Sequence, residues 1–232
     1  MENRKSVLST RYAIGSFILA ILVPFLPLFI ARSWDWWEAW AFGIICSVGF
    51  VITRWLAARR HPDILAERGQ IMNQADAKGW DKILVPTWLS LFIVIVAVAG
   101  VNKLFAWSPG FGILVSILAL IIFLAGYIFG SYALIENRFF SGMNRIQTER
   151  GHQVVSSGPY AWVRHPGYTG TIISYMVVPF LLGSWWACVP TLVFVVAGIL
   201  RTYLEDRMLL NELDGYGEYA QRVRYRLIPG VW

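Results

Sequence analysis

Charged residues are scarce in this chain of 232 residues. Asp, Glu, Lys and Arg make up 15% of it, whereas a soluble domain usually holds about 25%. Hydrophobic residues make up 57%, and the mean hydropathy is +0.55. The scarcity of charge argues against a soluble domain with an unusually apolar core and favours a protein embedded in a membrane.

Cysteine is scarcer still. The two cysteines, Cys46 and Cys188, both fall inside apolar runs, so each is expected to be a small core residue rather than a disulfide partner or a metal ligand. No cluster with zinc-type spacing occurs, and no metal site is predicted. Internal repeats and low-complexity linkers are also absent from the sequence, which predicts a single domain over residues 1–232.

Long apolar runs account for the hydropathy, and four of them approach the roughly 20 residues that span a bilayer. A fifth region, Tyr168–Leu200, has no charged residue but contains Pro179, Gly183-Ser184 and Pro190, which predicts a helical hairpin or two further short spans. The predicted fold is an all-α integral membrane protein with four N-terminal spans, this hairpin and a cytoplasmic C-terminal helix. The four runs are Tyr12–Ala31, Trp37–Ala57, Ile83–Val101 and Phe111–Ile135.

The basic residues are distributed unevenly, which predicts the orientation of the chain. Of the 20 Lys and Arg, only Arg32 and Lys103 lie in the first and third connections between the predicted spans. By the positive-inside rule the N-terminus is therefore cytoplasmic. The net charge of +6 is explained by this topology, and no nucleic-acid partner is expected. Four tryptophans on the opposite side fit an interfacial aromatic belt: Trp34, Trp36, Trp37 and Trp107.

A polar segment, Gly151–Gly170, separates two of the apolar regions. It reads GHQVVSSGPYAWVRHPGYTG and holds two of the three histidines, an arginine, two tyrosines and four glycines. Ser157-Gly158-Pro159 and His165-Pro166-Gly167 are turn signals, which break helices and let the backbone approach a ligand. Polar groups beside membrane spans are costly unless they line a site. The segment is predicted to form a site on the cytoplasmic side; the alternative is a Pro/Gly loop with incidental polar residues.

The C-terminal tail, from Arg201 to about Arg222, has helical character. Arg201 and Glu205 are four residues apart, so they share one helix face and can pair. Asp206 follows directly. Because these charges come at the end of an apolar region, near the predicted membrane surface, a functional role is favoured over a solvated helix face. The aromatic and basic end of the chain is expected to fold back on the protein.

The polar segment and the tail together resemble the isoprenylcysteine carboxyl methyltransferase family and its phospholipid N-methyltransferase relatives. The matching pieces are the polar segment, the tail RTYLEDRMLLNELDGYGEYAQRVRYRLIPG and the lead-in ENRFFS. The resemblance covers Glu136–Trp232, with weaker similarity over Pro62–Lys82. RHPxYxG alone is moderately specific, but joined to the downstream ED…YxxY…RxIP it is strong. Residues 136–232 are therefore the predicted catalytic core, and residues 1–135 supply the N-terminal spans.

The resemblance implies a methyltransferase that uses S-adenosylmethionine as its cosubstrate. Glu205 and Asp206 occupy the family's paired acidic position in the cosubstrate site, where many relatives have Glu-Glu. Arg201 and Glu205 are the implied catalytic residues, and Asn137 and Arg201 are the implied substrate-binding residues. The implied cosubstrate-binding positions of the loop are His152, Val154, Gly158, Tyr160, Arg164, His165, Pro166, Tyr168 and Gly170.

The residue types suit this chemistry. S-adenosylmethionine carries an ammonium, which suits Glu205, and a carboxylate, which suits Arg164 or His165. Its sulfonium is attracted to aromatic faces by about 0.5–2 kcal/mol. A carboxylate acceptor is already ionised at neutral pH and needs only a cation to hold it, for which Arg201 is the candidate. An amine acceptor would instead need Glu205 or a histidine as a base.

The function that the resemblance implies is carboxyl O-methylation of a prenylcysteine-like acid whose lipid tail enters from the bilayer, although another lipophilic acid or a thiol would also fit. Two other enzyme classes stay open: a phospholipid amine N-methyltransferase, and an NADPH-dependent membrane reductase of the sterol reductase type, which shares a similar C-terminal pattern. A non-enzymatic membrane scaffold is the remaining alternative, and it leaves the polar segment unexplained. The expected partners are the lipid bilayer and a lipophilic or prenylated substrate, with no obligate protein partner.

Overall fold

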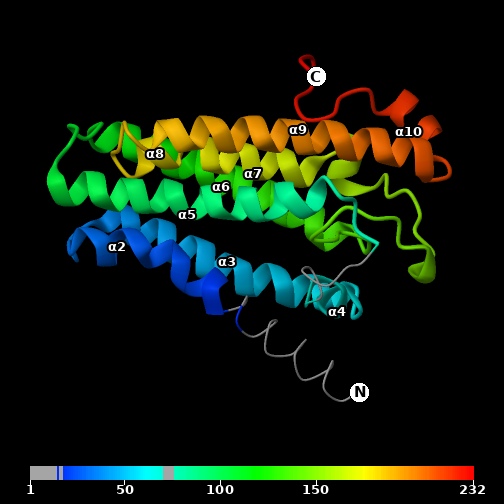
Figure 1. Ribbon diagram of the computed structural model, residues 1–232, viewed down its shortest axis with the longest axis horizontal. Helices are drawn as coiled ribbons and strands as arrows, with labels where there is room; N and C mark the ends of the chain where they lie inside the picture. Colours follow the sequence, from blue (N-terminus) through cyan, green and yellow to red (C-terminus); the bar gives the residue numbers. More distant parts are fainter. Residues whose placement is uncertain (1–14, 16–17, 70–75) are drawn as a thin grey trace.

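The computed structural model describes residues 15, 18–69 and 76–232. This part of the chain is helical and contains no strand. The long helices lie side by side (Figure 1), with α2 and α3 along one side and α9 along the opposite side. The elements are η1 (Val23–Phe25), α2 (Leu26–Ala31), α3 (Trp37–Arg60), α4 (Ile64–Gly69), α5 (Asp81–Phe105), α6 (Ile113–Glu136), η3 (Thr148–Arg150), η4 (Gly158–Ala161), α7 (Pro166–Met176), α8 (Val178–Leu181), α9 (Cys188–Glu212) and α10 (Tyr216–Arg222).

Four of these helices, α3, α5, α6 and α9, are long and apolar enough to cross a membrane. The first three coincide with predicted spans. Each is an apolar run that forms a helix, and a helix pairs its backbone N–H and C=O groups by internal hydrogen bonds, as the interior of a bilayer requires. A shorter apolar helix, Ile18–Ala31, falls within the first predicted span. That span, Tyr12–Ala31, also includes residues 12–14 and 16–17, which lie outside the described residues. The described chain is thus that of a multi-pass membrane protein.

The uncharged region after the polar segment forms a helical hairpin, as predicted, but its two arms are unequal. The first arm is α7 followed by the single turn of α8, and the second is the 25-residue helix α9. Gly183, with φ +66°, makes the turn between them. The Ser184 hydroxyl then accepts the Ala187 N–H at 3.3 Å, which leads the chain into α9.

The tail from Arg201 to about Arg222 is helical, as predicted, but its residues belong to two helices, α9 and α10. Arg201 lies inside α9, which continues to Glu212. Leu213 is extended (φ −110°, ψ 116°), and Gly215 has φ +79°, so the chain turns before α10 begins. The helix crosses from apolar to charged sequence without a break because backbone hydrogen bonds do not depend on side-chain polarity. Glu205 and Asp206 therefore stand on a continuous helix, which fixes their positions.

Helices α6 and α7 pack with their backbones in contact. A Cβ atom added at Gly170 would lie 2.4 Å from the Gly130 nitrogen and 2.5 Å from the Gly126 oxygen. The Ser174 hydroxyl crosses the same interface and donates to the Phe123 oxygen at 3.1 Å. Small residues allow this approach, as in other apolar helix pairs. The contact fixes α7, and with it the end of the polar segment, against α6.

The tryptophans of the predicted interfacial belt lie at or just before the start of α3, or follow α5, at one end of the bundle, and they differ in exposure. Trp34, Trp37 and Trp107 are exposed, as an interfacial belt requires. Trp36 is only 4% exposed and belongs to the main apolar core, so its assignment to the belt is wrong. At the other end, α4, α10 and the loop after α6 gather around the polar segment (Figure 1).

Candidate active site

The polar segment forms two turns before it enters α7. Gly158 begins η4 with φ +57°, a conformation that glycine adopts without strain. His165 precedes α7, and Pro166 is the first residue of that helix, where its missing N–H leaves no hydrogen bond unmade. The C-terminal end of the chain folds back here, as predicted. The Tyr225 and Arg226 oxygens accept the backbone N–H groups of Arg164 and His165 at 2.9 and 3.0 Å.

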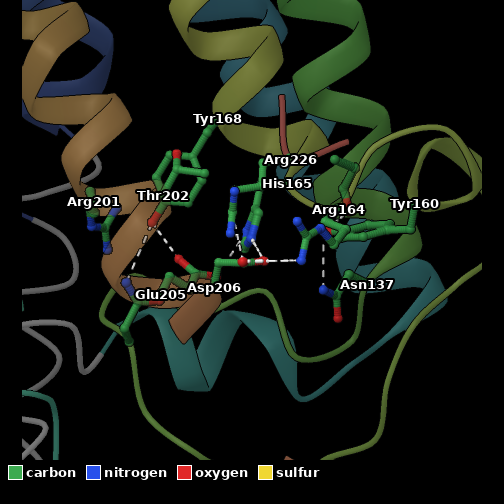
Figure 2. Close-up of polar contacts among 12 residues, drawn as sticks. Asn137, Tyr160, Arg164, His165, Tyr168, Arg201, Thr202, Glu205, Asp206 and Arg226 are labelled. Carbon is green, nitrogen blue, oxygen red and sulfur yellow. Dashed lines mark hydrogen bonds and ion pairs between the residues drawn. The ribbon is translucent and has the colours of Figure 1, made fainter. Parts of the chain in front are cut away.

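Asp206 is the centre of the polar network. Its carboxylate is fully buried and accepts from Arg164 Nη1 at 3.1 Å, Tyr216 Oη at 2.9 Å and Arg226 Nε at 2.8 Å. His165 Nε2 lies 3.1 Å from the same carboxylate. These partners come from the polar segment, α10 and the C-terminal end, and Figure 2 shows Arg164, His165 and Arg226 converging on the acid. Asp206 therefore joins three separate parts of the chain.

Glu205, one residue earlier, has a different environment. The Tyr168 hydroxyl donates to Glu205 Oε2 at 2.5 Å, and His165 Nδ1 lies 3.8 Å from Oε1. Its side chain is 21% exposed, whereas that of Asp206 is fully buried. Of the two adjacent acids, only Glu205 is available to a ligand.

Arg201 lies one helical turn before Glu205, but its ion-pair partner is Asp81. Arg201 Nε and Nη2 donate to the two Asp81 oxygens at 2.6 and 2.9 Å, and Nη2 also donates to the Gly142 oxygen at 2.9 Å. The expected shared face with Glu205 is confirmed, while the expected pairing is replaced by this bidentate bridge, whose planar geometry suits a buried guanidinium. The bridge uses Nε and Nη2 and leaves Nη1 available.

A cavity of about 280 Å³ lies where these elements meet. One water needs only about 10–15 Å³, so the space suits a ligand. Four predicted positions do not line it. Gly158 and Gly170 meet α6, Pro166 starts α7, and Asp206 is buried behind the wall. The predicted positions that line it are Asn137, His152, Val154, Tyr160, Arg164, His165, Tyr168, Arg201 and Glu205.

Two N–H groups on the cavity wall, one from His152 and one from Arg164, are available to donate a hydrogen bond to a ligand. Burial and the neighbouring Arg150 and Arg145 lower the pKa of His152 to about 4, so its ring is neutral near pH 7. His152 Nδ1 accepts the Gln147 N–H at 3.3 Å, which assigns the ring proton to Nε2. Arg164 Nε is buried and makes no hydrogen bond within the described residues. An orphaned buried donor of this kind indicates that a partner is missing.

The segment Phe139–Arg145 forms much of the wall, but the sequence analysis gave its first three residues only as part of the matching lead-in and missed Gly142–Arg145. Arg145 anchors it by ion pairs to Glu67, Asp76 and Glu149 at 2.6 to 2.8 Å. Asp81 was missed as well, because it stands at the edge of an apolar run. The sequence did contain a signal for this contact: the connection between α3 and α5 carries acids and the loop after α6 carries arginines, so the two can form ion pairs. The complementary sets are Asp63, Glu67 and Asp76, and Arg138, Arg145 and Arg150.

The cavity also has an apolar wall. Val85, Trp88 and Leu89 of α5 line it, and Leu89 is 53% exposed on the outer surface of that helix. Trp88 packs against Tyr168, with ring centroids 5.6 Å apart. Leu89 therefore belongs both to the wall of the chamber and to the exposed apolar surface of the bundle.

A multi-span helical protein with a polar chamber at one end of its bundle is the class that this fold and site define. Residues 117–211 match the sequence model of the isoprenylcysteine carboxyl methyltransferase (ICMT) family. The matched segment runs from α6 through most of α9. It contains the polar segment, Arg201 and Glu205.

Two individual proteins are similar to the chain. The solved structure of the eukaryotic intramembrane Ras methyltransferase ICMT shares its fold with a TM-score of 0.54 and 20% identity, over 98% of this chain and 86% of that one. The Delta(14)-sterol reductase TM7SF2 of Mus musculus is 30% identical over 95 residues, which are 40% of this chain. The chain spans only 23% of the length of that reductase.

Proposed function

We propose that this protein transfers the methyl group of S-adenosylmethionine to the carboxylate of a lipophilic acid of the prenylcysteine type. One observation carries the proposal: Arg201 and Glu205, one turn apart on α9, line the same cavity as the polar segment and the partly exposed apolar residue Leu89. The family match and the fold of the solved ICMT structure support it.

The cavity wall fits the cosubstrate. Glu205 offers the carboxylate that an ammonium needs, and the orphaned Nε of Arg164 and the Nε2–H of His152 are donors for a carboxylate. Tyr160 and Tyr168 supply aromatic surface for a sulfonium. Bound S-adenosylmethionine supplies an electrophilic methyl group on that sulfonium. The remaining loop residues that line the cavity, Val154 and His165, complete this side of the proposed site.

The other predicted positions have a supporting role in this proposal. Asp206 holds Arg164 and His165 in place, so it orients the donors without reaching the ligand. Gly158, Pro166 and Gly170 set the path of the segment between α6 and α7. Positioning of this kind is the main contribution that a protein makes to an in-line displacement.

The acceptor is held by Arg201 and Asn137. Arg201 presents Nη1 for the carboxylate, since Asp81 occupies its other side. Asn137 lines the cavity beside Tyr160, to whose hydroxyl it donates at 3.1 Å. A carboxylate is ionised near neutral pH, so none of these residues has to remove a proton. The lipid tail extends past Val85, Trp88 and Leu89 toward the bilayer.

The same proposal includes the placement in the membrane. The chain crosses the bilayer at the first predicted span and through α3, α5 and α6, and the hairpin of α7–α8 and α9 enters the bilayer from the cytoplasmic side and returns to it. The N-terminus, α10 and the cavity lie on the cytoplasmic side, from which a soluble cosubstrate can arrive. Residues 136–232 form the catalytic core of a single domain, and the bilayer itself delivers the acceptor.

A reductase is the competing function, favoured by the partial match to the sterol reductase. Titration of the purified protein with each cosubstrate separates the two. The proposal expects saturable binding of S-adenosylmethionine and none of NADPH. Binding of NADPH alone contradicts it, and binding of neither favours a non-enzymatic scaffold.

A further inference from the structure

The charged residues that line the cavity differ in whether they form an ion pair with an opposite charge. Four arginines and one acid, Glu205, line the cavity. Three of the arginines, Arg145, Arg164 and Arg201, form ion pairs with carboxylates that stand behind the wall. The fourth is Arg68, the penultimate residue of α4.

Among the described residues, Arg68 donates its hydrogen bonds to backbone carbonyl groups. Its Nη1 donates to the Phe140 oxygen at 3.2 Å and the Ser141 oxygen at 3.3 Å, and its guanidinium lies 5.4 Å from the Phe140 ring centroid. In the described part of the chain it forms no ion pair with a carboxylate. The adjacent Glu67 is bound by Arg145 through both of its oxygens, at 3.1 and 2.8 Å.

Arg68 and Arg201 are held along one short piece of backbone. Arg68 binds the oxygens of Phe140 and Ser141, and Arg201 binds the oxygen of the next residue, Gly142. All five residues line the cavity. Two guanidinium groups from α4 and α9 therefore reach the same wall from opposite ends of the sequence.

The two guanidiniums differ in net charge. Asp81 neutralises Arg201, so that pair contributes donors but little net charge. Arg68 contributes a full positive charge that burial disfavours. The pKa of Arg68 is held well below its ordinary value, first by burial and then by the like charges of Arg54 and Arg201. An anion in the cavity beside Arg68 would relieve both effects.

We propose that Arg68 is a specificity-determining residue that selects an anionic head group on the methyl acceptor, while Arg201 orients that group. The proposal rests on the function proposed above and adds the cation that recognises the charge. It explains how the site favours a carboxylate over an amine, because an ammonium beside Arg68 would be repelled. It also assigns a role in substrate recognition to α4, the helix that carries Arg68.

Arg68 could instead have a purely structural role, in which its hydrogen bonds hold α4 against the backbone of residues 140 and 141. This role predicts a different effect of its loss on ligand binding. Loss of a structural contact weakens every ligand of the cavity, whereas loss of a recognition charge weakens anionic ligands alone. A pair of ligands with the same shape and different charge therefore separates the two roles.

The test measures binding of an S-prenylcysteine carboxylate and its uncharged carboxamide to the full chain in lipid nanodiscs. In Arg68→Gln, carboxylate affinity should fall about 10- to 100-fold, the expected loss of a charged hydrogen bond. Carboxamide and S-adenosylmethionine affinities should stay unchanged, and Arg68→Lys should recover part of the loss. Arg59→Gln, which removes an exposed arginine stacked on Trp55, is the control and should bind both ligands normally.

Equal losses for carboxylate and carboxamide, or no loss for either, overturn the proposal. Binding is read without methyl transfer, so the two proposals fail separately. A wild-type protein that prefers the carboxylate through Arg68 but transfers no methyl group contradicts the proposed function alone. One that forms the methyl ester while Arg68→Gln keeps its preference contradicts the role of Arg68 alone. A wild-type protein that binds neither compound contradicts both.

Discussion

Arg201 and Asp81 form a bidentate ion pair that joins the middle of α9 to the first residue of α5. The two residues are 120 positions apart, and the carboxylate is completely buried. The same carboxylate accepts the Asn144 N–H at 2.6 Å and so also fixes the loop after α6. The pair holds the Arg201 guanidinium on the cavity wall, so its geometry is part of the proposed active site.

Asp81→Asn is expected to destabilise the protein. The change leaves the buried Arg201 charge without its partner, and breaking a buried pair in this way costs about 3–5 kcal/mol. Thermal unfolding of the purified protein in detergent measures the loss. Asp35→Asn, which removes an exposed acid, is the control and should unfold like the wild type. The double variant with Arg201→Met should regain part of the loss. An unaltered midpoint in Asp81→Asn contradicts the assignment.

Glu205→Ala is expected to weaken cosubstrate binding about 10- to 100-fold while the helix stays folded. In the proposed site this acid binds the cosubstrate ammonium, and losing a charged hydrogen bond costs about 1.5–3 kcal/mol, or 10- to 100-fold in affinity. Glu205→Gln should bind equally weakly although it keeps an acceptor for Tyr168. Glu212→Ala on the same helix removes an exposed acid paired with Lys78 and serves as the control. Full affinity in Glu205→Ala would show that another acid binds the ammonium.

Gly170→Ala is expected to lower stability by about 1–3 kcal/mol, the usual cost of overpacking. A Cβ atom there meets the backbone of Gly130 and Gly126, which cannot move aside. Gly217→Ala in α10 is the matched control, because a Cβ atom there meets nothing within 4 Å. Denaturation midpoints of both variants decide the point. If Gly170→Ala lost cosubstrate affinity at unchanged stability, Gly170 would belong to the binding site instead.

His152 is expected to make stability depend on pH. Its pKa is lowered to about 4 in the folded protein from the ordinary 6.5, so the unfolded chain binds more protons between these values. The free energy of unfolding should therefore decrease as the pH falls from about 6.5 to 4. His152→Asn should flatten this part of the profile, which melting temperatures measured at several pH values can show. An identical slope in the variant would mean that other groups cause the dependence.

Much of the fold could be predicted from the sequence, because apolar length decides which helices can cross a membrane. The uncharged runs located α3, α5 and α6 within a few residues. The end of α9 could not be located by charge, since the helix continues through Arg201 to a glycine turn at Gly215. Trp36 looked like its neighbours in the sequence, but only packing decides that it is buried.

The site was predictable only in part, for a related reason. Motif positions such as Arg164, His165 and Glu205 line the cavity, whereas Gly158, Gly170 and Asp206 support it from behind. A sequence motif includes both the residues that line the cavity and the residues that support them, and it does not distinguish between the two. Asp81 and Arg68 lie in a connection far away in the sequence, and only the folded chain brings them to α9 and the 139–145 segment.

The most direct test of the account is transfer of a labelled methyl group from S-adenosylmethionine by the purified protein in lipid nanodiscs, with an S-prenylcysteine analogue and a phospholipid extract offered together. The account predicts label in the prenylcysteine fraction as a base-labile methyl ester, and its loss in Arg201→Gln and Glu205→Ala. A base-stable N-methyl product in the phospholipid fraction, or no labelled product at all, contradicts it.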